Sequence, residues 1–242
     1  MIYLIKISNL FSFTIERTPV MRGKNSFYSK YIKRILDIIC SLVGIVLFCW
    51  LFAIVAILVK IKLGSPVIYK ANRPGKIDPK TGEEKIFKLC KFRSMSNETD
   101  ENGKLLPDTQ RLTKFGRILR ATSLDELPEI FNILKGDMSI VGPRPLGIKY
   151  IPYYTEQERH RHDVSPGLTG LAQIRGRNNL SWEEKFAYDV EYVNNVSLFF
   201  DIRILFETVI KVVKREGIGQ GEQRPVSLHI ERAERVEKEH QQ

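Results

Sequence analysis

The sequence predicts a mainly helical α+β protein, with an apolar N-terminal helix embedded in a membrane and a small β-hairpin in the domain that follows. Residues 38–59 carry no charged side chain, two short strand-like runs follow them, and the patterns beyond residue 110 are mostly helical. We divide the chain into an N-terminal extension (1–29), a membrane helix (30–62), a cytoplasmic domain (63–216) and a polar tail (217–242).

The apolar segment from Ile38 to Val59 is long enough to cross a bilayer. As an α-helix it would extend roughly 33 Å, against a hydrocarbon core about 30 Å thick. A buried helix of a soluble protein is the alternative, but an uninterrupted apolar run of this length is unusual there. A cleaved signal peptide fits poorly, because the run starts late, lacks a small-residue cleavage site and continues into Lys60-Ile61-Lys62.

Basic side chains flank both ends of this segment: Lys30, Lys33 and Arg34 precede it, and Lys60, Lys62, Lys70 and Arg73 follow it. A simple span would place one basic flank outside, against the positive-inside rule. A re-entrant helix that enters and leaves by one face avoids this conflict, although no proline marks a bend and Gly44 is the only small helix-weakening candidate. Both geometries remain open. In either case we expect everything after Val59 to lie on the cytoplasmic face, since no later stretch is apolar enough to span.

Two strands joined by a turn-rich loop are expected after the membrane helix. Pro66 to Tyr69 is a short apolar run, and Lys85 to Phe92 alternates polar and apolar residues as a half-buried strand does. Between them Asn72 to Glu84 fits a hairpin loop, and the polar, acidic stretch from Asn97 to Asp108 fits an exposed loop.

Helical periodicity dominates the rest of the domain. One predicted helix has a basic face opposite an apolar one, formed by Arg111, Lys114, Arg117 and Arg120 against Leu112, Phe115, Ile118 and Leu119. The basic face is either a solvated stripe or a surface for anions. Residues 198–213 form an amphipathic helix whose wide apolar arc fits either the core or the membrane interface. We expect the polar tail from Gly217 to be loosely ordered.

The composition indicates anionic partners. The formal net charge is +10, which suits nucleic acid, anionic lipid or phosphorylated substrates without choosing among them. Cys40, Cys49 and Cys90 have no metal-binding spacing, and we expect them to be reduced packing residues. P-loop and Rossmann motifs are absent. The histidines offer no zinc arrangement, and we expect His160 and His162 on the surface.

The neighbouring carboxylates Asp125 and Glu126 are the main candidates for chemistry. A structural explanation exists, because Ser123 and Glu126 have the spacing of a helix capping box and Pro128 suits a first helical turn. A functional explanation is that a carboxylate ionised at a helix N-terminus can act as a nucleophile while its neighbour helps to hold a magnesium ion. Arg120 and the proline-flanked Arg144 would then supply a site for phosphates.

A series of motifs in fixed order resembles the bacterial sugar transferases, the monotopic phosphoglycosyl transferases. The resemblance extends from about Tyr31 to Gly217. Its marks are Lys33-Arg34 with Asp37, Asn72-Arg73-Pro74-Gly75, Lys91-Phe92-Arg93-Ser94-Met95, Ser123-Leu124-Asp125-Glu126-Leu127-Pro128, the run from Gly136-Asp137-Met138-Ser139 to Val141-Gly142-Pro143-Arg144-Pro145, and Pro166-Gly167-Leu168-Thr169-Gly170.

The resemblance implies transfer of sugar 1-phosphate from a UDP-sugar to polyprenol (undecaprenyl) phosphate at the bacterial cytoplasmic membrane, with release of UMP. It implies that Asp125 forms a covalent phosphosugar intermediate and that Asp125 and Glu126 hold Mg²⁺. Basic residues at matching positions imply phosphate contacts, namely Lys91, Arg120, Arg144 and Arg177. Membrane lipids are the further partners; the resemblance allows a homodimer and implies no nucleic acid.

The membrane segment departs from the family in one respect. The re-entrant helix of the family often has a Ser-Pro break near its middle, where this chain has Cys49-Trp50. Two other functions remain as alternatives. A non-catalytic membrane scaffold would have no need of the Asp125-Glu126 pair, and an ordinary glycosyltransferase would release UDP in place of UMP.

Overall fold

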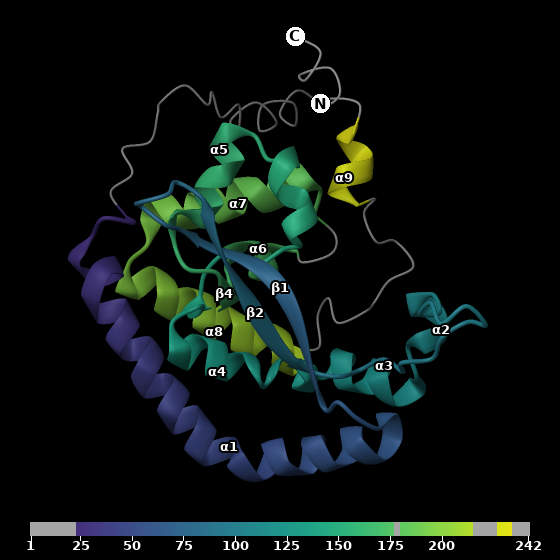
Figure 1. Ribbon diagram of the computed structural model, residues 1–242. Helices are drawn as coiled ribbons and strands as arrows, with labels where there is room; N and C mark the ends of the chain where they lie inside the picture. The colour runs from purple at the N-terminus through teal and green to yellow at the C-terminus, as the bar shows by residue number, and fades with distance from the viewer. Residues whose placement is uncertain (1–22, 177–179, 215–226, 234–242) are drawn as a thin grey trace, which may run out of the picture.

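A long N-terminal helix underlies a domain built from short helices and two small sheets (Figure 1). The computed structural model describes residues 23–176, 180–214 and 227–233. In chain order the elements are the π-helix η1 (Tyr28–Ile32), α1 (Lys33–Leu63), β1 (Ile68–Ile77), β2 (Glu84–Phe92), α2 (Asp108–Arg111), α3 (Lys114–Ala121), the 3-10 turn η2 (Leu124–Glu126), α4 (Glu129–Lys135), β3 (Ser139–Val141), η3 (Ile148–Tyr153), α5 (Glu156–Arg159), η4 (His160–Asp163), β4 (Gly167–Thr169), α6 (Leu171–Arg175), α7 (Trp182–Asn195), α8 (Leu198–Lys214) and α9 (Leu228–Glu231). The mainly helical fold with a small two-stranded sheet is therefore confirmed.

Helix α1 runs down one side of the domain and then turns along its base (Figure 1). Its concave side packs against α4, and Gly44 allows the close approach because a Cβ there would lie 2.8 Å from Cδ1 of Ile130. Arg34 donates hydrogen bonds to the carbonyl oxygens of Ile133 and Leu134 at 2.6 and 2.7 Å. Both carbonyls lie at the C-terminal end of α4, where acceptors outnumber the backbone donors of the helix, so Arg34 caps α4 and ties it to α1.

Much of the apolar surface of α1 is uncovered. Val46, Leu47 and Trp50 have 72%, 60% and 59% of their surface exposed. The helix is long and apolar enough to cross a membrane, and only 11% of its most apolar window is buried within the protein. An apolar surface of this extent is unfavourable in water, and it fits a helix embedded in lipid. Cys40 and Cys49 are free and exposed on this helix, so the expectation that they are packing residues is wrong.

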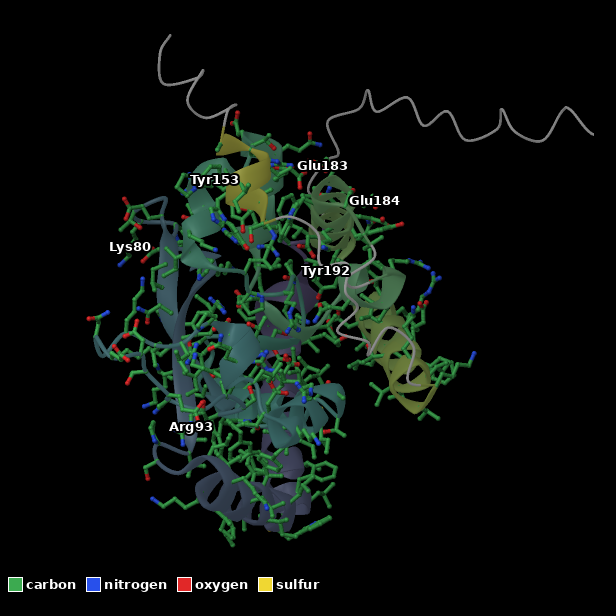
Figure 2. The ribbon with its side chains drawn as sticks, turned by 90° about the vertical axis from the view of Figure 1, so that its right-hand side faces the viewer. Lys80, Arg93, Tyr153, Glu183, Glu184 and Tyr192 are labelled. Atoms are coloured by element: carbon green, nitrogen blue, oxygen red, sulfur yellow. The ribbon has the colours of Figure 1, made fainter. Side chains whose placement is uncertain are left out.

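Strands β1 and β2 form the expected antiparallel hairpin, but its loop is shorter than predicted. Asn72, Arg73 and Pro74 pair with Lys88, Phe87 and Ile86. The longer strand β1 was not predicted because it contains Pro74, and proline within a strand normally argues against pairing. In the structure Pro74 lies beside a register shift. At the other end Arg93 donates to the carbonyl oxygens of Ser65 and Leu63. Figure 2 shows Arg93 near the lower end of the hairpin, towards α1, so the hairpin is anchored to the C-terminal end of α1.

A second sheet, which the sequence did not predict, joins two distant motifs. β3 and β4 are parallel and contain three residues each, too few to show a periodic pattern. A Cβ on Gly167 would lie only 2.1 Å from the backbone nitrogen of Gly142. Glycine is therefore required where the loop that carries Arg144 crosses the Pro166-Gly167 segment.

The predicted basic helix over 111–120 is two helices. Asp108–Arg111 and Lys114–Ala121 are separated at Leu112, and Thr113 caps the second helix by accepting a hydrogen bond from the Gly116 nitrogen at 3.0 Å. A local side-chain cap of this kind competes with continuous helix. Ile118 is 63% exposed and Leu119 is buried, so the expected apolar face is only partly directed to the core.

Helix α8 presents most of its apolar side chains outward. Phe199, Phe206 and Val213 are 84%, 67% and 75% exposed, while Asp201 and Ile204 are buried. Of the two interpretations of this helix, the membrane interface fits better than the core.

In the C-terminal tail, Leu228 of α9 is fully buried and Arg232 pairs with Glu158 and Glu183 at 2.6 Å. The expectation of loose order is therefore wrong for residues 227–233.

Candidate active site

The carboxylate pair lies in the turn η2, immediately before α4. Ser123 precedes it with φ of 56° and ψ of 17°, a left-handed conformation that side chains other than glycine adopt rarely, and its hydroxyl makes no capping hydrogen bond. The expected capping box is therefore wrong. Pro128 adjoins the start of α4, as its fixed φ allows. Asp125 is buried, with 8% of its surface exposed, so the strained turn holds a carboxylate inside a pocket.

Two basic side chains hold Glu126. Nζ of Lys91, from β2, and a guanidinium nitrogen of Arg144, from the loop after β3, lie 2.6 and 2.7 Å from Oε1 of Glu126. Burial disfavours the charged form of Glu126, but Arg144 and Lys91 outweigh this effect and lower its pKa to about 2. Glu126 is therefore ionised and rigidly placed. The sequence predicted these three residues for one site, and the fold brings them together from three separate segments.

Asp125 is in a different electrostatic position. Burial raises its pKa, the negative charge of Glu126 raises it further, and Lys91, Arg120 and Arg144 oppose both effects. Within the described ranges, no side chain forms a hydrogen bond or ion pair with the Asp125 carboxylate. Asp125 faces the main cavity, a volume of about 830 Å³ that Glu126, Lys91, Arg120 and Arg144 also line. Nε of Arg120 donates to Oγ of Ser94 at 2.8 Å.

The pair offers suitable oxygens for a magnesium ion. Both cationic partners of Glu126 bind Oε1, so Oε2 and the Asp125 carboxylate remain for a cation. No group of three or more His, Cys, Asp or Glu side chains with metal-site geometry occurs among the described residues. Magnesium commonly binds one or two carboxylates and completes its shell with water and substrate phosphates. The raised pKa of Asp125 also indicates a carboxylate that a nearby positive charge would stabilise.

Glu129 belongs to the site but was not predicted. Its carboxylate is 4% exposed and lies 3.0 Å from Nζ of Lys91, so Lys91 bridges Glu126 and Glu129. Burial raises the pKa of Glu129, Lys91 counteracts this, and Glu126 adds to the rise. In the sequence Glu129 looked like an ordinary acidic residue in a first helical turn. Arg177, the remaining predicted phosphate contact, lies outside the described residues.

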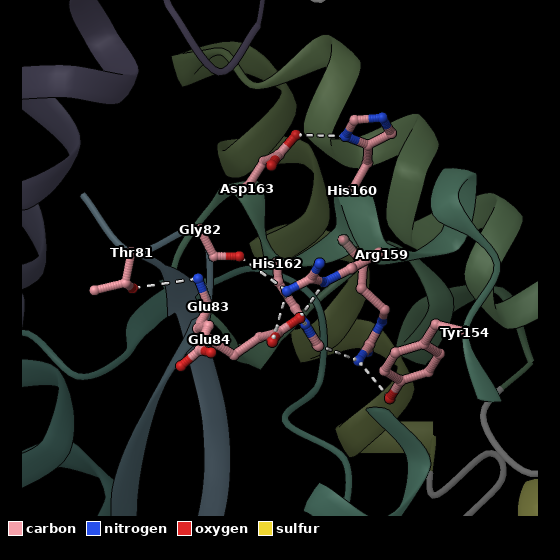
Figure 3. A network of polar contacts seen from close by, with 10 residues as sticks. Thr81, Gly82, Glu83, Glu84, Tyr154, Arg159, His160, His162 and Asp163 are labelled. Carbon is pink, nitrogen blue, oxygen red and sulfur yellow. Dashed lines mark hydrogen bonds and ion pairs between the residues drawn. The ribbon is translucent and has the colours of Figure 1, made fainter. Parts of the chain in front are cut away.

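A buried polar network supports the backbone of Arg144. Figure 3 shows the part of this network around Glu84, His162 and Tyr154. Arg161 is 1% exposed; its guanidinium donates to Oδ2 of Asp189 at 2.7 Å and to the carbonyl oxygen of Arg144 at 2.7 Å. It also lies 3.2 Å from Nε2 of His162, whose Nδ1 lies 3.1 Å from Glu84. Because a guanidinium can only donate, Nε2 accepts and Nδ1 carries the proton. His162 is therefore a neutral, buried link, and its predicted surface position is wrong.

This network predicts loss of stability in mild acid. Burial lowers the pKa of His162, although Glu84 opposes the shift, while Arg161 and Arg159 reinforce it. Because the folded-state pKa is below the unfolded value of about 6.5, the unfolded state takes up the proton first and stability falls as pH drops below that value. His162→Gln keeps one donor and one acceptor without titrating. The thermal midpoint should fall less between pH 7.5 and 5.5 in this variant than in the wild type; equal falls would contradict the assignment.

Comparisons with known proteins agree with this site. The family model described as bacterial sugar transferase matches residues 28–215. The chain is 55% identical over 162 residues to the uncharacterized sugar transferase EpsL of Bacillus subtilis, covering 67% of this chain and 77% of the relative. It is 34% identical over 233 residues to the undecaprenyl-phosphate galactose phosphotransferase of Salmonella typhimurium, covering 89% of this chain and 48% of the relative.

A third relative is the UDP-glucose:undecaprenyl-phosphate glucose-1-phosphate transferase of Klebsiella pneumoniae. It is 38% identical over 190 residues, which cover 74% of this chain and 39% of the relative. The chain thus spans less than half the length of these last two relatives, whose names state a reaction. The family match covers most of the chain and includes every element from η1 to α8. The protein belongs to the bacterial sugar transferase family.

Proposed function

We propose that this transferase moves a sugar 1-phosphate from a UDP-sugar to polyprenol phosphate and releases UMP. Relatives are named for reactions of undecaprenyl phosphate, and one of them for the use of UDP-glucose. The observation that carries the proposal is the buried Asp125 beside the half-buried Glu126, within a cavity lined by Lys91, Arg120 and Arg144. Carboxylates surrounded by cations suit a reaction in which phosphoryl groups are attacked and released.

In the proposed first step, an oxygen of Asp125 attacks the β-phosphorus of the UDP-sugar. The bond from that phosphorus to the oxygen shared with the α-phosphate breaks, and UMP leaves with the bonding electrons. In the second step an oxygen of polyprenol phosphate attacks the same phosphorus and frees the Asp125 carboxylate. The product is a polyprenol diphosphosugar. A covalent intermediate means that two polyanionic substrates need not occupy the site together.

Other residues have supporting roles in this proposal. Arg144, Arg120 and Lys91 would bind phosphoryl oxygens, and Glu126, held by Lys91 and Arg144, would keep these cations in place. Mg²⁺ held by Asp125 and Glu126 would offset charge on the diphosphate and on the departing UMP. Arg177 would be a further phosphate contact. Homodimer formation stays a prediction.

The membrane helix has a purpose in this reaction, because one substrate carries its phosphate at the bilayer surface. We propose that α1 is re-entrant and that the domain lies on the cytoplasmic face of the inner membrane. The turn of α1 along the base of the domain (Figure 1) and the basic residues at both ends support this geometry.

The released nucleotide tests the function. The purified protein is incubated with Mg²⁺, polyprenol phosphate and a panel of UDP-sugars, and UMP and UDP are measured separately. Release of UMP that depends on the lipid phosphate is expected with at least one sugar. Release of UDP would identify a glycosyltransferase, and absence of any lipid-dependent release across the panel would favour a scaffold.

Cysteine labelling tests the topology. In a background that lacks Cys40, Cys49 and Cys90, Lys30→Cys and Lys62→Cys should both react with a membrane-impermeant maleimide only from the cytoplasmic side. A re-entrant helix returns both ends to one face, whereas a spanning helix separates them. Labelling of the two positions from opposite sides would disprove the re-entrant geometry and leave the reaction unaffected.

A further inference from the structure

A second, smaller cavity adjoins the main one. It has a volume of about 310 Å³, and we call it the side cavity. This is near the lower end of the range of about 300–1,000 Å³ typical of small-ligand pockets. The two cavities share part of their lining, including Arg73, Lys91, Arg144, Leu146, Tyr150 and Trp182. A ligand whose reacting phosphate lies at Asp125 can therefore extend into the side cavity.

The cations of the side cavity fall into two groups. Lys91 and Arg144 are bound to carboxylates, at 2.6 and 2.7 Å from Glu126. Arg73 has no carboxylate partner among the described residues. One of its terminal guanidinium nitrogens lies 3.4 Å from the carbonyl oxygen of Asn72, the preceding residue. The Nε atom of Arg73 is buried and has no hydrogen-bond partner among the described residues. A buried donor without an acceptor is unfavourable. The arrangement suggests that an external anion supplies the acceptor.

Lys149 adds a second cation at the same place. Its Nζ lies 5.3 Å from the centre of the Tyr150 ring, and the chain makes no ion pair with it among the described residues. The rings of Tyr150 and Trp182 lie 5.4 Å apart and form an aromatic wall of the cavity. Two cations beside aromatic rings match a ligand that carries both a phosphate and a flat, ring-containing group.

The side cavity lies on the side of the site away from the membrane helix. Lys91 lies on β2 beside the end of the hairpin that joins α1. Arg73, on β1, pairs with Phe87 of β2. Phe87 and Lys91 are four residues apart on β2, which is about 13 Å at 3.3 Å per residue. Figure 2 shows Arg93 towards α1 and Tyr153 and Glu183 at the opposite end of the domain. Tyr150 belongs to the same helix as Tyr153, and Trp182 adjoins Glu183. A lipid phosphate approaches from the α1 side, so the side cavity faces the water-soluble substrate.

We propose that Arg73, assisted by Lys149, binds the α-phosphate of the nucleotide donor in the side cavity and retains it as the phosphate of UMP after transfer. The inference rests on the proposed function, which makes the nucleotide end of the donor the group that leaves. Arg73 is then a substrate-binding residue placed on the leaving-group side of the phosphorus that Asp125 attacks. The nucleoside lies against the Tyr150 and Trp182 wall.

Nucleotide affinity tests this assignment. UMP binding to the full-length protein in nanodiscs is measured by calorimetry for wild type, Arg73→Gln and Arg73→Lys. A hydrogen bond to a charged group contributes about 1.5–3 kcal/mol, so Arg73→Gln should weaken UMP binding roughly 10- to 100-fold. Arg73→Lys should recover part of it. Uridine affinity and the KM for polyprenol phosphate should not change. Lys76→Gln is the matched control, because Lys76 is an exposed cation on the same strand.

The outcomes separate the possibilities. Unchanged UMP affinity in Arg73→Gln overturns the inference. If the KM for polyprenol phosphate also rises in that variant, Arg73 binds the phosphate of the lipid substrate and not that of the nucleotide. If Arg73→Gln does not fold, Lys149→Gln on the exposed side of the cavity should still weaken UMP binding and leave uridine binding unaltered. A wild type that releases UDP would refute the proposed reaction, whereas UMP release with unaltered UMP affinity would refute only the role of Arg73.

Discussion

Asp125→Asn should reduce lipid-dependent UMP release by roughly 1,000-fold or more, the scale seen when a nucleophile is removed. The asparagine amide has almost the same shape as the carboxylate but is a very poor nucleophile and carries no negative charge. Nothing in the packing explains such a loss, since no described side chain forms a hydrogen bond or ion pair with this carboxylate. Initial rates of UMP release, normalised to folded protein, provide the measurement.

A matched control uses another aspartate. The Oδ1 atom of Asp100 accepts hydrogen bonds from the backbone nitrogens of Asn102 and Lys104, and an asparagine there keeps this acceptor. Asp100→Asn should therefore retain full activity. Intact-protein mass spectrometry of wild type mixed with UDP-sugar, without lipid, should detect a phosphosugar adduct that Asp125→Asn lacks. Full turnover in Asp125→Asn would rule out the covalent mechanism.

The parts of the fold that could be predicted are those with long or regular patterns. The long apolar helix and the hairpin are visible in the sequence because apolar length and two-residue alternation are local properties of the chain. The β3–β4 pairing was missed because each strand has three residues and their pairing depends on contact between Gly142 and Gly167. The break at Thr113 was missed because a capping side chain outweighed a helical periodicity that continues across it.

The predicted site shows the same division. Asp125, Glu126, Lys91, Arg120 and Arg144 were found through ordered motifs, and all five line the main cavity. Their arrangement was not predictable, because Lys91 reaches Glu126 across a sequence separation of 35 residues. Glu129 and Arg161 carry no recognisable spacing. Their function follows from burial: a charged group that is 4% or 1% exposed must have a partner, and only the fold shows which one.

Arg161→Met should be the most destabilising single change among the buried polar residues. It removes both hydrogen bonds from the guanidinium to Asp189 and leaves that carboxylate, 3% exposed, without its cation. Breaking one side of a buried pair costs about 3–5 kcal/mol. For a domain of this size the thermal midpoint should then fall on the order of 10 °C. Scanning fluorimetry of the solubilised protein gives the shift.

Two further variants distinguish the loss of an ion pair from simple loss of volume. Arg203→Met removes the exposed pair of Arg203 with Glu207 and should change stability by less than about 1 kcal/mol. In Arg161→Met/Asp189→Leu no buried charge is left unpaired, so most of the lost stability should return. Activity should not return with it, because the carbonyl oxygen of Arg144 still lacks the donor that Arg161 supplies at 2.7 Å. A double variant that is stable and fully active would show that this network supports folding alone, and that Arg144 is positioned by its contact with Glu126.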